Sequence, residues 1–325
     1  MKFNRLGRTD LEVSPLCFGG NVFGWTIDEP TSFRLLDQWV DAGMNFIDTA
    51  DAYSTWVEGN AGGESETIIG RWLKARGRRD DVVIATKVGM EMPGGKKGLS
   101  RAYINEAIEA SLRRLQTDYV DLYQSHFDDP ETPFEETLAA YEPLIRAGKV
   151  RAIGASNLTA ERLAESLRAS SGAGLPRYES LQPLYNLHDR EEFEGPLEDL
   201  CRAEGIGVIN YWSLASGFLT GKYRSEADLG KSPRGERVAK YLDARGLRIL
   251  GALDAIAAEA GATPGQVALA WLIARPSVTS PIASATTPGQ LAELVAAAEL
   301  KLDAAAIARL DAASAPARAA AAEPA

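Results

Sequence analysis

The sequence has few of the residues that mark metal-binding or disulfide-rich proteins. It contains two cysteines, Cys17 and Cys201, and two histidines in 325 residues. Two isolated cysteines cannot supply the spacing of a structural metal site, so we expect no bound metal. Because disulfides are scarce in reducing compartments, we expect a cytoplasmic protein with two free thiols.

Positive charge and long apolar runs are also lacking. The chain has 35 Lys and Arg residues against 45 Asp and Glu residues, a net charge of -10, and offers no basic stripe for nucleic acid. No apolar run approaches the ~20 residues that span a bilayer, and the N-terminal residues 1–5 lack the apolar core of a signal peptide. We therefore expect neither nucleic acid nor membrane as a partner.

What the sequence does contain is an alternation of apolar runs and helical periodicity. Eight strand-like runs are expected at residues 16–20, 46–48, 82–87, 120–126, 150–156, 180–185, 206–212 and 278–282. Helical patterns occupy 32–42, 64–75, 101–115, 133–147, 160–169, 196–204, 239–274, 289–300 and 304–313. Strands that alternate with helices indicate a parallel sheet, because parallel neighbours need long crossover connections.

Eight such units in one chain predict a closed (β/α)₈ TIM barrel. The open, doubly wound alternative would be favoured by a Gly-x-Gly-x-x-Gly turn after the first strand, and residues 19–24 do not have that spacing. Residues 1–15 alternate around a turn-like 7–10 segment, which predicts an N-terminal β-hairpin. We expect a single domain over residues 1–314 and a disordered tail at 315–325.

Four polar residues stand at or just after the ends of apolar runs, where barrel enzymes keep their chemistry. They are Asp48, Tyr53, Lys87 and His126. Taken singly, each has a structural interpretation as a cap or turn residue, a half-buried aromatic, a surface charge or a core histidine. Together they suit carbonyl reduction, with a phenol as proton donor and a nicotinamide cofactor as hydride source.

The phenol of Tyr53 is a poor acid at neutral pH by itself. Its ordinary pKa is about 10, so a neighbouring cation that favours the phenolate would make it a better acid. Lys87 would supply that cation, Asp48 would keep Lys87 charged and oriented, and His126 would hydrogen-bond the carbonyl oxygen.

Longer motifs resemble those of the aldo-keto reductase superfamily, in order and over nearly the whole chain. They are Phe46–Tyr53, Gly63–Gly70, Ala85–Lys87, His126, Gly154–Asn157, Leu181–Asn186, Tyr211–Tyr223 and Gln290–Leu291. The resemblance implies an (α/β)₈ barrel that reduces aldehydes or ketones, usually with NADPH. It also implies that Tyr53 donates the proton, that Lys87 and Asp48 tune the acidity of Tyr53, and that His126 orients the carbonyl.

The resemblance further implies the cofactor contacts. Ser156, Asn157 and Gln182 would bind the nicotinamide carboxamide, and Tyr211 would stack on the ring. The 213–222 segment would wrap the pyrophosphate, through Ser213, Leu214, Gly217, Leu219, Gly221 and Lys222. Ser284, Thr286, Gln290 and Glu293 would contact the adenosine end.

The chain departs from the family pattern after the last strand. Residues 282–290 contain no Arg or Lys to pair with the 2′-phosphate of NADPH, and Leu294 stands where asparagine is common. Ser284, Thr286 and a helix N-terminus remain as phosphate donors. We expect NADPH as cofactor, with NADH possible.

Aromatic residues mark a substrate pocket for a small-molecule carbonyl compound. Trp25, Trp56, Phe127 and Trp212 are candidates for its apolar wall, although each also suits core or loop packing. Residues 54–63 and 225–236 are candidate lids. Two other functions stay open: a cofactor-binding regulatory subunit of the potassium-channel beta type, and a barrel kept as a scaffold.

Overall fold

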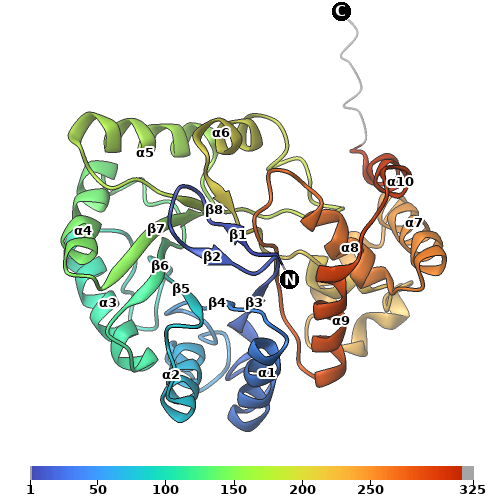
Figure 1. Ribbon diagram of the computed structural model, residues 1–325, viewed down its shortest axis with the longest axis horizontal. Helices are drawn as coiled ribbons and strands as arrows, with labels where there is room; N and C mark the ends of the chain where they lie inside the picture. Colours follow the sequence, from blue (N-terminus) through green and yellow to red (C-terminus); the bar gives the residue numbers. More distant parts are fainter. Residues whose placement is uncertain (1, 317–325) are drawn as a thin grey trace, which may run out of the picture.

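A ring of parallel strands forms the centre of the computed structural model, which describes residues 2–316. The eight strands follow the order β10-β3-β4-β5-β6-β7-β8-β9 (Figure 1). Their bounds are β3 (Cys17–Gly19), β4 (Phe46–Asp48), β5 (Val83–Val88), β6 (Val120–Ser125), β7 (Val150–Ser156), β8 (Ser180–Gln182), β9 (Gly207–Val208) and β10 (Ile282–Ala283). All eight predicted strands are confirmed.

The two edges of this sheet are joined, which closes the barrel. Val208 of β9 pairs with Val278 in a parallel bridge. The backbone N–H of Thr279 donates to the carbonyl of Val208 at 2.8 Å, and that of Ile282 donates to the carbonyl of Asn210 at 2.9 Å. The (β/α)₈ barrel predicted from the sequence is confirmed, and all strands end on the same side of it.

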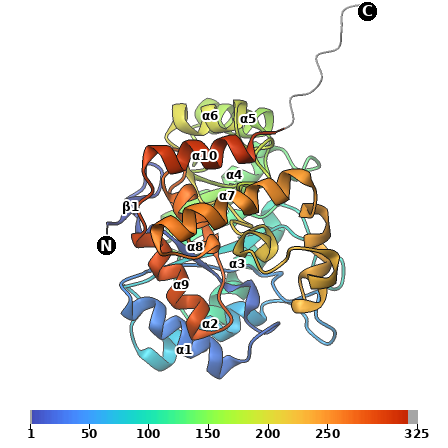
Figure 2. The same ribbon diagram turned by 90° about the vertical axis from the view of Figure 1, so that its right-hand side faces the viewer.

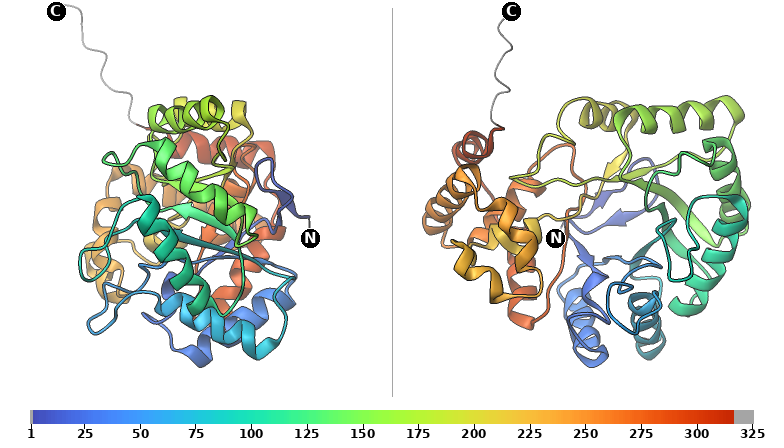
Figure 3. Two further views of the ribbon diagram at one scale, coloured as in Figure 1. Left: turned by 90° about the vertical axis from the view of Figure 1, so that its left-hand side faces the viewer. Right: turned by 180° about the vertical axis from the view of Figure 1, so that it is seen from behind.

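Ten α-helices of the described chain surround the strands, as the two views of Figure 3 show. They are α1 (Glu29–Asp41), α2 (Glu64–Arg76), α3 (Arg101–Leu115), α4 (Phe134–Arg146), α5 (Ala160–Ala173), α6 (Pro196–Glu204), α7 (Ala244–Ala260), α8 (Pro264–Ile273), α9 (Pro288–Glu299) and α10 (Ala304–Ser314). Among residues 2–316, no helix is long and apolar enough to cross a membrane.

Local capping explains where helices differ from the predicted bounds. The continuous pattern over 239–274 is broken after Ala260, because Gly261 takes a left-handed φ of +63° and Thr263 forms a capping box with Gln266. Helix α1 begins before the predicted residue 32, because Asp28 accepts a hydrogen bond from the Thr31 N–H. The expected loop 225–236 contains the short 3₁₀ helix η3 (Glu226–Lys231), and a second one, η4 (Gly235–Tyr241), begins in it and occupies the start of the helical pattern predicted from residue 239.

The predicted N-terminal hairpin is confirmed and covers one end of the barrel. Strands β1 (Asn4–Arg5) and β2 (Glu12–Val13) pair antiparallel. Leu6, Leu11 and Val13 are buried and pack with interior residues such as Phe46. Figure 2 shows β1 at one end of the molecule and the gold-coloured segment after residue 220 at the other. A ligand can therefore enter the barrel from the carboxyl ends of the strands, which the hairpin does not cover.

Both thiols are buried within this architecture and neither forms a disulfide, as expected from the sequence. Cys17 lies inside the barrel, and burial raises its pKa well above that of an ordinary thiol. The expected disorder of the tail falls largely on residues 317–325, which lie outside the described residues.

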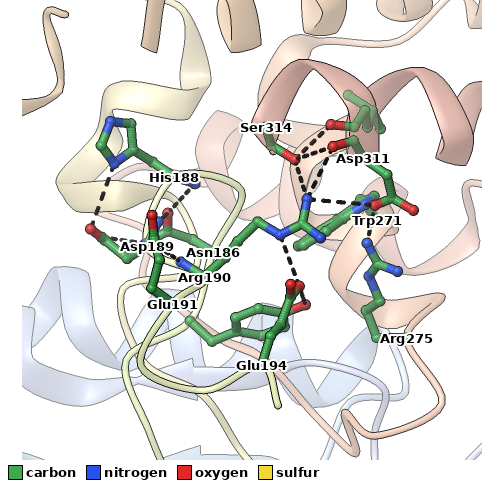
Figure 4. Close-up of polar contacts among 12 residues, drawn as sticks. Asn186, His188, Asp189, Arg190, Glu191, Glu194, Trp271, Arg275, Asp311 and Ser314 are labelled. Carbon is green, nitrogen blue, oxygen red and sulfur yellow. Dashed lines mark hydrogen bonds and ion pairs between the residues drawn. The ribbon is translucent and has the colours of Figure 1, made fainter. Parts of the chain in front are cut away.

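Helix α10 is held against the barrel by a polar network (Figure 4). Asp311 accepts a hydrogen bond of 2.9 Å from the Trp271 indole N–H and forms an ion pair with Arg275. Arg190 donates to the Ser314 hydroxyl at 2.7 Å and to Glu194 at 2.8 Å. The carboxylate of Asp311 is therefore the acceptor for two groups of helix α8 and its C-terminal extension.

Replacing Asp311 with alanine should lower the free energy of unfolding by about 1–3 kcal/mol, because the buried Trp271 N–H and Arg275 would lose their acceptor. Urea denaturation measures this effect. Asp311→Asn keeps an oxygen acceptor without the charge and should lose less. Equal stability of Asp311→Ala and the parent chain would contradict the role of this contact.

Candidate active site

The four predicted catalytic residues meet at the carboxyl ends of neighbouring strands. Asp48 is the last residue of β4, Lys87 lies near the end of β5, and His126 directly follows β6. Tyr53 reaches the same place from the loop after β4. Because the strands are parallel and in register, their ends deliver these side chains to one side of the barrel.

The phenol, the ammonium and the carboxylate are in direct mutual contact. Lys87 Nζ donates to Asp48 Oδ2 at 2.6 Å and to Tyr53 Oη at 2.8 Å. The Tyr53 hydroxyl donates to the same Asp48 Oδ2 at 3.0 Å. The third Lys87 proton goes to the Thr49 carbonyl at 2.9 Å. The ammonium is thus fixed in one orientation, with one of its protons directed at the phenol oxygen.

Two glutamines hold the other oxygen of Asp48. Gln182 Nε2 donates to Oδ1 at 3.0 Å, and Gln124 Nε2 donates to it at 3.3 Å. Asp48 and Lys87 are both fully buried, and a buried ion pair needs this kind of additional hydrogen bonding. Gln124 had no role in the sequence analysis. Strand alternation gave the signal for it, since Gln124 is in register with Lys87.

The protonation of Tyr53 differs from the sequence-based expectation. Burial raises the pKa of Tyr53 well above that of a free phenol, and the Asp48 carboxylate raises it further. The expected lowering of the pKa by Lys87 does not prevail, because burial and the Asp48 carboxylate, 3.0 Å from the phenol oxygen, dominate. At neutral pH Tyr53 is therefore a protonated phenol and retains the proton that a donor must supply.

His126 is a neutral imidazole beside this phenol. Burial lowers the pKa of His126 well below its ordinary value, and the Lys87 charge lowers it further. Its ring centroid lies 6.0 Å from that of Tyr53. Within residues 2–316, no hydrogen-bond partner meets its buried Nδ1. The ring is fixed by its backbone and neighbours and offers polar atoms to a ligand.

The four residues expected around a nicotinamide ring form a cluster next to Asp48. The Ser156 hydroxyl donates to the Gln182 carbonyl at 2.8 Å. Asn157, with a left-handed φ of +58°, donates to the Ser156 hydroxyl at 3.1 Å and accepts from the Tyr211 hydroxyl at 2.8 Å. Hydrogen bonds therefore connect this cluster, through Gln182, to Asp48.

The segment expected to wrap a pyrophosphate has an unusual backbone. Ala215, Ser216 and Gly217 all have left-handed φ values, +48°, +57° and +95°. Positive φ is rare for residues with a side chain, and such conformations are frequent where a backbone binds a ligand. Two of the three N–H groups are already used, because Ala215 donates to the Trp212 carbonyl at 2.7 Å and Gly217 donates to the Leu214 carbonyl at 2.8 Å. The strained turn itself, and not a row of free N–H groups, distinguishes this backbone.

Side chains around this segment divide into those that support it and those that face outward. Asn210 was not predicted; its side chain donates to the Tyr185 carbonyl at 2.7 Å and to the Ser213 hydroxyl at 3.2 Å. Leu219 is buried in the core, which leaves only its backbone for a ligand. Lys222 is exposed. The remaining predicted positions of this segment, Leu214 and Gly221, flank η2 (Ala215–Thr220) as its N-cap and its C-cap.

The expected adenosine-binding residues lie around the start of α9. Thr287 caps this helix, and Gln290 accepts from both the N–H and the hydroxyl of Thr286, at 2.8 and 2.9 Å. Ser284 donates to the Gly19 carbonyl at 2.7 Å, so its hydroxyl is already engaged. Glu293 is exposed on α9. A helix N-terminus therefore faces outward here, without a lysine or arginine in residues 282–290.

The predicted aromatic wall borders Tyr53 and His126. Trp56 is 41% exposed and its ring centroid is 6.1 Å from that of Tyr53. Trp25 packs edge-on against Trp56 at 5.5 Å, and the 45% exposed Phe127 stacks on His126 at 5.1 Å. Large exposed aromatics on both sides of the phenol favour the pocket interpretation over core packing.

Arg234, which the sequence analysis did not single out, covers this wall. Its guanidinium lies 5.0 Å from the Trp25 ring centroid. Its charge opposes the rise in the pKa of Tyr53, although burial and Asp48 outweigh it. Arg234 comes from the segment that was expected to be a lid or a solvated connection, between η3 and η4. No periodic pattern indicated where this residue would lie.

The described residues 2–316 contain no group of three or more histidine, cysteine, aspartate or glutamate side chains that could hold a metal ion. The polar atoms at the strand ends come instead from a phenol, an amine, amides and hydroxyls. This donor set suits an organic ligand with hydrogen-bonding groups and a phosphate.

Comparison with known proteins agrees with this chemistry. Residues 15–315 match the model of the aldo/keto reductase family. The chain is 38% identical to the uncharacterized oxidoreductase YrpG of Bacillus subtilis over 93% of both chains. It is 34% identical to the aldo-keto reductase YhdN of the same organism, over 90% of this chain and 88% of the relative. It is also 37% identical to a probable voltage-gated potassium channel subunit beta of Arabidopsis thaliana, over 92% of both chains.

Proposed function

Since this chain belongs to the aldo/keto reductase family and is an oxidoreductase, we propose that it reduces small aldehydes or ketones to alcohols with Tyr53 as proton donor. The observation that carries the proposal is the contact of the Tyr53 hydroxyl with both Lys87 and Asp48. A nicotinamide cofactor, when bound, supplies the hydride for such a reduction.

Tyr53 gives its proton to the carbonyl oxygen as that oxygen gains charge. The phenolate left behind faces the Lys87 ammonium, whose N–H already points at the phenol oxygen across 2.8 Å. Lys87 therefore stabilises the product form of the donor, and Asp48 holds Lys87 in place. The raised pKa of Tyr53 ensures that the proton is present before the reaction.

The residues at the strand ends fit a nicotinamide dinucleotide. Ser156, Asn157 and Gln182 present amide and hydroxyl groups, and the half-buried Tyr211 offers an aromatic face beside them. The exposed Lys222 supplies positive charge for the pyrophosphate, and Gly217 allows close approach of the backbone to it. We propose NADPH as the favoured cofactor, with the N-terminus of α9 facing the 2′-phosphate.

Replacing His126 with alanine should lower kcat/KM for the carbonyl substrate by about 10²–10³-fold, because the substrate oxygen would lose a positioned hydrogen-bond donor. The dissociation constant for NADPH should stay within about twofold, since His126 makes no side-chain contact with the proposed cofactor residues. Steady-state kinetics and fluorescence titration measure the two quantities separately. Undiminished kcat/KM on every substrate tested would remove His126 from the mechanism.

The proposal is tested first by titrating intrinsic fluorescence with NADPH and NADH, followed by absorbance of the reduced nicotinamide with a panel of aldehydes. Binding with consumption of reduced cofactor supports the reductase. Equal or better turnover with NADH would overturn the cofactor preference. Absence of binding would overturn the proposal as a whole.

A regulatory role remains the second candidate, because relatives of this chain are named as probable potassium channel beta subunits. This role predicts tight cofactor binding without turnover of any aldehyde in the panel. The same titration and assay therefore distinguish the two functions.

A further inference from the structure

Two adjoining open depressions, called cavities here, lie on the outer face of the barrel, one between helices α2 and α3 and the other at the carboxyl ends of these helices. Their volumes are about 370 and 340 Å³, and Gln116 lines both. The first is bordered by Thr67, Arg71, Ala110, Arg113, Arg114 and Gln116, and the second by Leu73, Lys74, Gly77, Arg78, Arg79, Gln116 and Thr117. Together they form one groove, called here the α2–α3 groove. The two helices are neighbours on the outer face of the barrel (Figure 1).

The charge of this groove is opposite to that of the whole protein. Six of its lining residues are lysine or arginine and none is acidic, in a chain of net charge -10. No basic stripe was expected from the sequence, because acidic residues outnumber basic ones in the chain as a whole. The fold brings together cations of α2, of the turn after it, and of α3, which lie about 40 positions apart in the sequence.

Buried carboxylates fix two of these guanidinium groups from behind. Arg114 Nε donates to the fully buried Glu66 at 2.6 Å. Arg79 donates to the buried Asp121 at 2.6 Å and to the Val82 carbonyl at 2.8 Å. Arg79 also donates to the Thr117 hydroxyl and to the Tyr119 carbonyl, both at 3.2 Å, which leaves one of its five N–H groups for a ligand. Arg114 also donates to the Ser111 hydroxyl at 3.3 Å and keeps three N–H groups. The position of both guanidinium groups is set before any ligand arrives.

Two other cations are not neutralised. Within residues 2–316, no carboxylate lies within ion-pair distance of Lys74 or Arg113, and both side chains are exposed. Arg71 and Arg78 pair with Glu29 and Asp81, but both arginines are more than half exposed, and such surface pairs contribute little. The groove therefore keeps a local excess of positive charge.

Helix dipoles explain only part of this arrangement. Cations in the last turn stabilise a helix, which accounts for Lys74 on α2 and for Arg113 and Arg114 on α3. Arg71 lies before the last turn, and Arg78 and Arg79 lie beyond the helix end. Helix stabilisation also gives no reason for two cavities between the cations.

We propose that the α2–α3 groove binds a small anion that carries at least two phosphate groups. Each cavity has its own set of cations: Arg71, Arg113 and Arg114 in one, and Lys74, Arg78 and Arg79 in the other. Arginine forks match phosphate oxygens, and two adjoining sets fit two linked phosphates better than a single carboxylate. The groove does not share a residue with the candidate active site, so this site is independent of the proposed reaction.

The test is calorimetric titration of the full-length protein with inorganic tripolyphosphate at low salt. The double variant Lys74→Gln/Arg113→Gln removes the two unpaired cations without breaking an ion pair. It should bind at least about tenfold more weakly, because each charge-assisted hydrogen bond is worth about tenfold or more. The matched control Arg168→Gln/Arg248→Gln removes two exposed cations of α5 and α7 and should bind within about twofold of the parent chain.

Three results would overturn the proposal: no binding by the parent chain, equal weakening in the control, or undiminished binding in the groove variant. The last result would place the anion elsewhere, for instance at the 215–217 turn. Equally tight binding of citrate would overturn the phosphate assignment. Thermal unfolding of each variant verifies that it is folded.

Discussion

Replacing Tyr53 with phenylalanine should lower kcat for carbonyl reduction by about 10²–10⁴-fold, the range that a positioned proton donor contributes. The variant loses one hydroxyl and keeps the ring that packs beside Trp56 and His126. Lys87 and Asp48 contact each other directly, at 2.6 Å in the parent chain, so their ion pair does not depend on the hydroxyl. The loss therefore reports proton transfer rather than collapse of the site.

Cofactor affinity separates this effect from misfolding. The dissociation constant for NADPH should be nearly unchanged in Tyr53→Phe, because the proposed cofactor residues lie on later strands. Tyr103→Phe, which removes a half-buried phenol on α3, serves as the control and should keep the parent kcat. If Tyr53→Phe reduces aldehydes as fast as the parent, another group donates the proton and the mechanism is wrong.

The second large effect concerns Asp51, a buried acid between Asp48 and Tyr53 in the sequence. Burial raises the pKa of Asp51 to about 8, and the neighbouring Glu66 contributes to the rise. The unfolded chain has the ordinary value of 3.8. Between these two values the folded protein holds a proton that the unfolded chain releases, so Asp51 makes stability fall as pH rises. Above pH ~8 the penalty is complete and constant.

Asp51→Asn mimics the protonated acid and lacks this penalty. The variant should gain stability over the parent progressively from pH ~5 to ~8, by up to roughly 1.4 kcal/mol per pH unit and a few kcal/mol in all. Urea denaturation of both proteins at pH values from ~5 to ~9 gives the difference, in which other titrating groups cancel.

Asp129 provides the opposite case as a control. Backbone hydrogen bonds lower the pKa of Asp129 despite its partial burial, so its titration falls below this pH range. Asp129→Asn should be less stable than the parent by a constant amount. If the difference in the free energy of unfolding between Asp51→Asn and the parent is also independent of pH, Asp51 is ionised in the folded protein over this pH range.

The barrel and the ends of its strands were predictable because parallel strands are buried on both faces and appear as continuous apolar runs. Asp48, Lys87 and His126 could be placed together because all such strands end on one side. The last strand was less predictable. Its run begins at Val278, but the regular ladder occupies only Ile282–Ala283, since Pro281 has no N–H to donate.

What could not be predicted depends on long-range proximity. Arg234 lies in a segment without periodicity, so nothing in the sequence indicated its contact with Trp25. Whether the pKa of Tyr53 is raised or lowered depends on burial as well as on nearby charges, and only the fold shows how deeply the phenol is buried. The α2–α3 groove combines charges from two helices, and no single segment shows an excess of them.

Closure of the barrel also constrains how the chain is made. Strand β3 pairs with β10, and Ser284 bonds the Gly19 carbonyl across 265 positions of sequence. During synthesis, one edge of β3 therefore has no partner until almost the whole chain has left the ribosome. An unpaired edge strand is a site for pairing with other chains. The growing chain can consequently aggregate through this edge until residues 282–283 have been made and have paired with β3.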